Sequence, residues 1–279
     1  MYKWFQIGAF CFQLTYDDAV CIPEHFLQFQ VKEPGDSEFV YRLRIMHSLP
    51  ALVEKILLRR PDLTVYQTAA GEARLIGVKG QPAPYALYRE VSGREAEIFL
   101  ASDALDSLRF DPVFTSLFAL ERQMIRKDSL ILHCAYIRYQ GSAILFSAPS
   151  ETGKSTQADL WEMYRGSETV NGDRALLRNM DGVWHACGWP VCGTSEICHP
   201  SDTPIGSVVM LRQGKENHAE RLSPMQAFAQ IYSQITINQW NREFVGKAVE
   251  LIEDLVTHVP VWQLTCDISE AAVQCLYDA

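Results

Sequence analysis

The sequence lacks the features that would place a chain in a membrane or outside the cell. No apolar run approaches the ~20 residues of a membrane-spanning helix. Residues 1–6 (MYKWFQ) lack the basic and then apolar layout of a signal peptide. We therefore expect a cytoplasmic protein with no membrane partner. An apolar content of 48% is ample for a packed core, and 279 residues suffice for one large or two ordinary domains.

Basic residues are also scarce. The chain has 25 Lys and Arg against 34 Asp and Glu, which gives a formal net charge of −9. Nucleic-acid recognition needs a basic face, so we expect no nucleic-acid partner. The sequence contains no internal repeat and no low-complexity segment, so nothing indicates a solenoid or a disordered tail. The sequence leaves a homo-oligomer open.

The eight cysteines form no regular framework, and no Cys-x-x-Cys pair occurs. His185, Cys187, Cys192, Cys198 and His199 lie close together in sequence, but their spacing fits no common zinc site. We expect reduced thiols that pack as small apolar side chains.

The most informative stretch is residues 142–164. Residues 142–147 (SAILFS) are a short apolar run, which predicts a buried strand, and residues 157–164 suit a helix. Between them, residues 148–156 (APSETGKST) nearly match the phosphate loop Gly-x-x-x-x-Gly-Lys-Ser/Thr. Strand, loop and helix in this order are the context that such a loop needs.

The chemistry of phosphate binding explains these residue types. Backbone N–H groups of the loop surround the anion, and the next helix aims its free N–H groups and positive dipole end at it. We expect Lys154 to contact the terminal phosphates and Ser155 to bind magnesium, with ATP and Mg²⁺ as ligands. The predicted nucleotide-binding residues are Ser150, Glu151, Thr152, Gly153, Lys154, Ser155 and Thr156.

Two positions depart from the loop pattern. Ala148 replaces the first glycine, which is a small change, and Glu151 stands where glycine is common. A carboxylate beside a triphosphate would repel it unless the side chain points to solvent.

The remaining chain indicates two domains. Residues 1–108 have the composition of a β-rich (α+β) domain of unknown role, with one helix over residues 49–60. We place the boundary before a helix that Asp111-Pro112 opens and that extends to Arg126. Residues 109–279 then alternate predicted strands (130–137, 142–147, 169–178, 207–212, 261–266) with helices (157–164, 223–235, 241–257).

Asp173 lies at the entry of the strand over 169–178. In phosphate-loop proteins a second strand supplies an acid to the metal, and Asp173 is the candidate. The following loop, residues 188–196, is rich in glycine and hydroxyl groups. Such loops often hold substrate, which makes Thr194 and Ser195 candidate substrate contacts. An ordinary connection between strands is the alternative for this loop.

The order of these elements resembles the HPr kinase/phosphorylase family, in particular its short relatives encoded among peptide-modification genes. ATP-dependent phosphoenolpyruvate carboxykinase, which shares that core, is similar more distantly. The resemblance covers about residues 110–279. It implies an α/β fold with a phosphate-loop core and a mixed sheet, preceded here by the β-rich domain.

The resemblance also implies roles for residues around the loop. His133 falls where the family has a histidine that approaches the phosphates or the catalytic acid. The family's adjacent aspartates fall on residues 171–174 (NGDR), where Asp173 is the single acid. Asp173 is either the metal ligand, with Gly172 at the base position, or the base, followed by Arg174. Glu196 is the counterpart of a further metal-binding acid in the family. The family's arginine near the phosphates corresponds to Arg212 or Arg221.

From these residues we expect a kinase that uses Lys154, Asp173 and His133 to move the γ-phosphate of ATP to a hydroxyl. The acceptor is expected to be a serine or threonine of a peptide or small protein, or else a small hydroxylated metabolite. A non-catalytic nucleotide-binding module that recruits a peptide is the alternative from another class, which the missing acid and Glu151 favour. A phosphate-loop fold that binds no nucleotide is the third.

Overall fold

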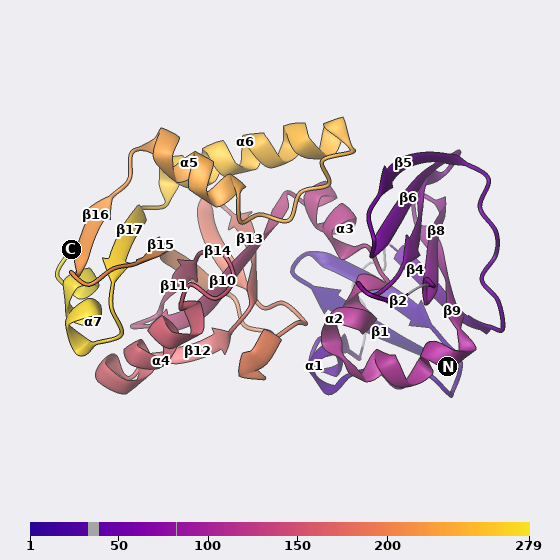
Figure 1. Cartoon of the computed structure of the whole chain (residues 1–279), viewed down its shortest axis with the longest axis horizontal. Coiled ribbons are helices and arrows are strands. Elements are labelled where there is room, and N and C mark those ends of the chain that lie inside the picture. The colour runs from indigo at the N-terminus through magenta and orange to yellow at the C-terminus, as the bar shows by residue number, and fades with distance from the viewer. Residues whose placement is uncertain (33–38, 82) are drawn as a thin grey trace. The chain divides into compact units, whose positions relative to one another are not determined.

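The computed structural model describes residues 1–32, 39–81 and 83–279, apart from the side chain of Thr194. The chain divides into an N-terminal unit, Met1–Leu120, and a C-terminal unit, Glu121–Ala279 (Figure 1). Each unit contains one sheet with both parallel and antiparallel strands, so the prediction of a mixed α/β protein is confirmed at that level. No helix in the described ranges is both long and apolar enough to cross a membrane.

Nine strands within the described residues form the sheet of the N-terminal unit, in the order β3-β1-β2-β4-β9-β8-β7-β6-β5. Its helical segments are α1 (Glu24–Leu27), η1 (Ser102–Arg109) and α2 (Asp111–Ser116). The strands are β1 (Tyr2–Ile7), β2 (Phe10–Thr15), β3 (Gln30–Val31), β4 (Phe39–Met46), β5 (Lys55–Arg59), β6 (Leu63–Thr68), β7 (Gly71–Ile76), β8 (Ala86–Ser92) and β9 (Glu95–Ala101).

The helix predicted over residues 49–60 is wrong, because Lys55–Arg59 is the edge strand β5 and pairs antiparallel with β6. Ile56, Leu57 and Leu58 are consecutive apolar residues without the spacing of a helical face. Cross-strand pairing therefore decides the conformation of this segment.

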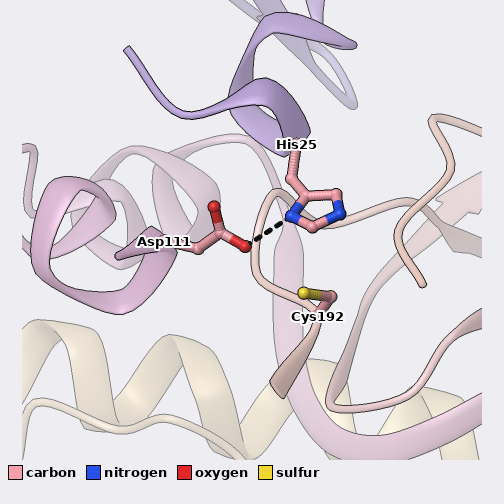
Figure 2. Close-up of side chains that lie close together, drawn as sticks. All are labelled: His25, Asp111 and Cys192. Atoms are coloured by element: carbon pink, nitrogen blue, oxygen red, sulfur yellow. Dashed lines mark hydrogen bonds and ion pairs between the residues drawn. The ribbon is translucent and has the colours of Figure 1, made fainter. Parts of the chain in front are cut away.

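The helix predicted over residues 111–126 is broken into α2 and α3 (Leu120–Arg126) at Ala119, whose φ is +47°. Pro112 lies in the first turn of α2 as predicted, but Phe110 takes the capping position. Asp111 instead ties α2 to α1, since its Oδ2 lies 2.7 Å from Nδ1 of His25 (Figure 2).

Residues 109–120 belong to the N-terminal unit, although the sequence analysis places the boundary at residue 108. The rings of Phe114 and Phe118 on and after α2 explain this. They lie 4.9 and 5.4 Å from the ring of Phe26, within an aromatic core that also holds Phe12 and Tyr41.

The C-terminal unit builds its sheet from β10 (Ser129–Tyr139), β11 (Ser142–Ser147), β12 (Glu168–Asn171), β13 (Arg174–Met180), β14 (Val183–Cys187), β15 (Thr203–Gln213), β16 (His218–Arg221) and β17 (Val261–Cys266). Its helical segments after α3 are α4 (Lys154–Arg165), η2 (Gly193–Ser195), α5 (Pro224–Tyr232), α6 (Arg242–His258) and α7 (Glu270–Tyr277). Strands β11, β15 and β17 run parallel to one another.

Helices cover both faces of this sheet: α5 and α6 lie on one side, α4 and α7 on the other (Figure 1). The alternation of side chains along β10 explains the two cores. Leu132, Cys134 and Tyr136 pack in the cluster with α5 and α6, whereas Ala135 and Ile137 pack in the cluster with α4 and α7. Residues 148–153, which follow β11, lead into α4 and so to the face that α4 covers.

Candidate functional site

The predicted strand, loop and helix are present as β11, residues 148–153 and α4. The loop reverses through two residues of positive φ, Glu151 (+66°) and Gly153 (+110°). A Cβ built on Gly153 would meet no atom within 4 Å. Glycine is therefore favoured there by the left-handed backbone and not by lack of space.

Both departures from the loop pattern are accommodated. Ala148 is 1% exposed, so only a small side chain suits its place under the loop. The side chain of Glu151 is exposed, which meets the condition that its carboxylate be solvated. From the neighbouring strand β15, Nε2 of Gln213 donates to the carbonyl oxygens of Glu151 and Thr152, both at 3.4 Å. Gln213 thus holds the loop from the side, a role that the sequence analysis missed.

Lys154, the first residue of α4, is buried at 8% exposure. Its ammonium donates to the carbonyl oxygens of Ala148 (3.2 Å) and Pro149 (3.4 Å), within its own loop. Desolvation lowers the pKa of Lys154, and the nearby charge of Asp173 acts in the opposite direction. The ammonium is desolvated and contacts these two carbonyl oxygens at long distances. An anionic ligand could therefore replace them as its partner.

Ser155 and Thr156 follow on the first turn of α4. The first N–H groups of a helix have no intrahelical partner and carry the positive end of its dipole. At α4 these groups adjoin the loop, so the turn offers amides and a cation to one anion. Ser150 and Thr152 lie in the loop itself, with Ser150 exposed.

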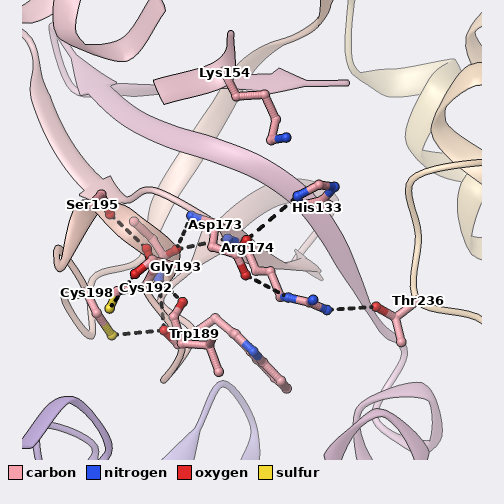
Figure 3. Close-up of polar contacts among 12 residues, drawn as sticks. His133, Lys154, Asp173, Arg174, Trp189, Cys192, Gly193, Ser195, Cys198 and Thr236 are labelled. Carbon is pink, nitrogen blue, oxygen red and sulfur yellow. Dashed lines mark hydrogen bonds and ion pairs between the residues drawn. The ribbon is translucent and has the colours of Figure 1, made fainter. Parts of the chain in front are cut away.

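Asp173 lies in the turn between β12 and β13, which together replace the single strand predicted over 169–178. Residue pairing fixes its place: His133 on β10 pairs with Arg174, and the amide of Cys134 donates to the carbonyl of Asp173 at 3.0 Å. The Asp173 carboxylate lies between two side chains. Its Oδ1 is 3.7 Å from Nε2 of His133, and its Oδ2 accepts from Nε of Arg174 at 2.9 Å (Figure 3).

Figure 3 also shows the ammonium of Lys154 directed toward the His133, Asp173 and Arg174 group. Desolvation lowers the pKa of His133, and the charge of Lys154 lowers it further, whereas Asp173 raises it. His133 is consequently neutral at pH 7 and can accept a proton. The structure thus brings together the three residues predicted as catalytic, Lys154, Asp173 and His133.

Asn171, which is not among the predicted site residues, organises this turn. Its side chain is fully buried: Oδ1 accepts from the amides of Asp173 (2.8 Å) and Arg174 (2.9 Å), and Nδ2 donates to the carbonyls of Trp189 (2.8 Å) and Val191 (3.0 Å). An aspartate could not donate to the two carbonyls. The signal was available, because asparagine before Gly-Asp favours a turn closed by its own side chain.

Two glycines allow the loop 188–196 to close on the acid. A Cβ on Gly172 would lie 2.1 Å from Oγ of Ser195, and a Cβ on Gly193 would lie 3.0 Å from Cβ of Asp173. Ser195 therefore fills the space beside Gly172, where one alignment with the family would put a base. The Ser195 hydroxyl donates to the carbonyl of Cys192 at 2.8 Å. The side chain of Thr194 lies outside the described residues.

The remaining predicted residues are scattered. Glu196 follows η2 with an exposed side chain and a φ of +55°. Arg212 is exposed at the carboxyl end of β15, one residue before Gln213. Arg221 pairs with Trp262 near the start of β17, so it lies at the opposite end of that strand from the loop. Arg212 is thus at the loop edge of the sheet and Arg221 is not.

The cysteines and histidines of residues 185–199 do not gather. Within the described part of the C-terminal unit, no three ligand atoms of His, Cys, Asp or Glu lie within 4.8 Å of one another. Cys187, Cys192 and Cys198 are buried. Cys198 donates to the carbonyl of Trp189 at 2.9 Å, in the segment that Asn171 holds.

No family model and no curated protein matches this chain. Among solved structures, the HPr(Ser) kinase/phosphatase from Coxiella burnetii is similar to it, with 9% sequence identity and a TM-score of 0.33. The similarity covers 53% of this chain and 94% of that one. Such values indicate a distant structural relation and carry no statement about activity or ligands.

Proposed function

We propose that this chain is an ATP-dependent phosphotransferase that moves the γ-phosphate of ATP to a hydroxyl group. The observation that supports it best is the convergence of Lys154, at the start of α4, with Asp173 and His133 from strands on the other side of the loop. A cation, a carboxylate and a neutral imidazole at one loop supply charge neutralisation and proton acceptance. Phosphoryl transfer needs little beyond these and correct positioning.

The proposed mechanism begins with the triphosphate on the amides of residues 153–156. Lys154 would exchange its contacts with Ala148 and Pro149 for the terminal phosphates. A magnesium ion suits the oxygen donors present, with Ser155 and Asp173 as its proposed ligands and Glu196 as a further one. When bound, the ion would neutralise charge that develops on the β- and γ-phosphates.

Asp173 has two candidate roles. As the base, it would take the proton of the attacking hydroxyl while Arg174 and His133 hold its carboxylate in place. As a metal ligand, it would leave proton acceptance to His133, which is neutral because burial lowers its pKa. In either role Asn171 sets the backbone from which the carboxylate projects.

We propose a serine or threonine of a peptide or small protein as the acceptor, with a small hydroxylated metabolite as the second class. The loop 188–196 is the proposed acceptor contact, because Gly193 is exposed and lies against Asp173. Thr194 and Ser195 directly follow Gly193 in sequence, and Arg212 is the cation at the same edge of the sheet.

The test is transfer of label from γ-labelled ATP to peptide and metabolite acceptors by the wild type, Lys154→Ala and Lys247→Ala. Lys247 is a matched control, since this partly exposed lysine of α6 pairs with Asp128, which follows α3. Loss of a preorganised charge at developing negative charge costs about 100-fold or more in rate. We expect that loss for Lys154→Ala only, and equal transfer by Lys154→Ala and the wild type would refute the proposal.

A non-catalytic nucleotide-binding module that recruits a peptide is the second candidate. It is favoured by the ion pair between Arg174 and Asp173, which occupies one oxygen of the acid in this turn. Calorimetry separates the two: ATP binding without label transfer to any acceptor favours the module. A thermal melt addresses a fold that binds no nucleotide, since MgATP at 100 times its dissociation constant should add about 2.7 kcal/mol of stability.

A further inference from the structure

The pairing of β11 decides what lies on each side of the phosphate loop. On one side β11 pairs with antiparallel β10, which carries His133 toward Asp173. On the other side it pairs with parallel β15, and β15 pairs with parallel β17. The carboxyl ends of these three strands meet at one sheet edge, where open α/β sheets bind ligands.

Strands β15 and β17 extend past the end of β11. Ser147, the last residue of β11, pairs with Met210, whereas β15 continues to Gln213 opposite Cys266. The three residues by which each of these strands extends past β11 form a wall roughly 10 Å high beside the loop. A cavity of about 360 Å³ lies there, between this wall, residues 151–153 of the loop and the first turn of α4.

Asp267, which directly follows β17, is a charged residue that lines this cavity. Its Oδ1 accepts from Nδ2 of Asn217 (3.1 Å) and from the amide (3.0 Å) and hydroxyl (2.5 Å) of Ser269. Its own amide donates to Oδ1 of Asn217 at 3.0 Å, and its carbonyl accepts from Nε2 of Gln157 at 3.2 Å. The residue is therefore held by five hydrogen bonds to three residues.

All of these side-chain bonds fall on Oδ1. Oδ2 of Asp267 accepts none from another residue in the described ranges. The hydrogen bond from Ser269, and then that from Asn217, lowers the pKa of Asp267, so the group is ionised at neutral pH. A fixed carboxylate with one oxygen free needs a ligand that brings hydrogen-bond donors.

A second acceptor accompanies it. Oε1 of Gln157, a residue that also lines the cavity, is buried and accepts no hydrogen bond from the described residues. The exposed Glu151 adds another negative charge at the loop side. This cavity therefore repels phosphate groups, which leaves it to a neutral, donor-bearing part of a ligand whose phosphates lie on the loop.

We infer that this cavity takes the ribose of a nucleoside triphosphate, with Asp267 accepting hydrogen bonds from its 2′ and 3′ hydroxyls. The inference rests on the proposed function. Vicinal hydroxyls are two donors with the spacing of a carboxylate, and an acidic residue recognises ribose in this way in other nucleotide-binding folds. The ligand then runs from Asp267 across the loop, with its terminal phosphate toward Asp173.

The experiment compares the affinities of the full chain for MgATP, for its 2′,3′-dideoxy analogue and for magnesium tripolyphosphate by calorimetry. The informative variant is Asp267→Asn, because its amide oxygen can still accept from Asn217 and Ser269 while the NH₂ group replaces the free oxygen. Glu270→Gln, an exposed neighbour at the start of α7, is the matched control.

For the wild type and Glu270→Gln we expect MgATP to bind about tenfold or more tightly than the dideoxy analogue, as for hydrogen bonds to a charged group. For Asp267→Asn we expect the two nucleotides to bind equally, with tripolyphosphate affinity close to that of the wild type. Asp267→Ala, checked by circular dichroism for folding, should behave likewise.

Three results would overturn the inference. Equal binding of both nucleotides by the wild type would show that Asp267 does not bind the ribose hydroxyls. A variant that weakens both nucleotides by the same factor assigns the carboxylate to the base or to the loop. Absence of binding by any phosphate compound removes the proposed function as well, and this outcome is distinguishable because tripolyphosphate reports on the loop alone.

Discussion

Replacement of Asn171 by alanine tests how the turn that carries Asp173 is held. The side chain is fully buried and makes four hydrogen bonds, all to backbone groups. At a net value of about 0.5–1.5 kcal/mol for each bond, the loss is roughly 2–6 kcal/mol. We expect about 3 kcal/mol, because water entering the vacated space would satisfy part of the four groups.

The assay is urea unfolding followed by tryptophan fluorescence. Five of the six tryptophans (Trp161, Trp184, Trp189, Trp240 and Trp262) lie in the C-terminal unit, so the signal reports mainly on the unit that holds Asn171. With a urea m-value of about 2 kcal/mol per molar, the midpoint should fall by about 1.5 M.

Asn179→Ala is the control, since the Asn179 side chain makes two hydrogen bonds at the partly exposed β13–β14 turn. The same count gives that variant a loss of about 1–3 kcal/mol, and we expect the lower end because water reaches the groups of a partly exposed turn. If Asn171→Ala unfolds within about 0.5 kcal/mol of the wild type, the amide does not hold the turn, and the account of how Asp173 is positioned is wrong.

Two further predictions concern the same site. Gly172→Ala should destabilise the chain by about 1–3 kcal/mol, because the new methyl group would lie 2.1 Å from Oγ of Ser195; a thermal melt should show this loss and its partial recovery in the double variant with Ser195→Gly, and an unchanged melt for Gly172→Ala would contradict the packing described. Burial lowers the pKa of His133 below its unfolded value; the unfolded state then binds more protons, so wild-type stability should fall as pH drops through about 6.5, and His133→Gln should show a flatter profile in urea unfolding between pH 5 and 8. Parallel profiles for the wild type and His133→Gln would argue against a neutral histidine at this site.

The local parts of the fold could be predicted from the sequence. The run of residues 142–147, the glycine at 153 and the helix after it are adjacent in the chain, and their pattern predicts β11, the loop and α4 correctly. Helix α6 likewise follows from its apolar spacing and from Asn241, whose side chain accepts from the amide of Phe244. The roles of Lys154, Ser155 and Asp173 stay predictions.

Local pattern does not predict the conformation where tertiary pairing outweighs it. Residues 55–59 form a strand because β6 offers them backbone partners. The pattern of residues 49–60 alone does not reveal this pairing. The predicted helix over 111–126 breaks at Ala119, where the chain passes from the N-terminal to the C-terminal unit. For residues 55–59 the deciding partner lies outside the segment, in the neighbouring strand β6.

The sequence by itself determined the local make-up of one turn: a lysine and a hydroxyl residue behind a glycine, between an apolar strand and a helix, because those features lie within the 23 consecutive residues 142–164. Only the tertiary structure decided which carboxylates flank that turn. Asp173 reaches it through the antiparallel pairing of β10 with β13, and Asp267 through the parallel pairing of β11, β15 and β17. The register of such strands is set by backbone hydrogen bonds and by packing of both sheet faces, and these link positions far apart in the chain, such as Ser147 with Met210 and Met210 with Gln263.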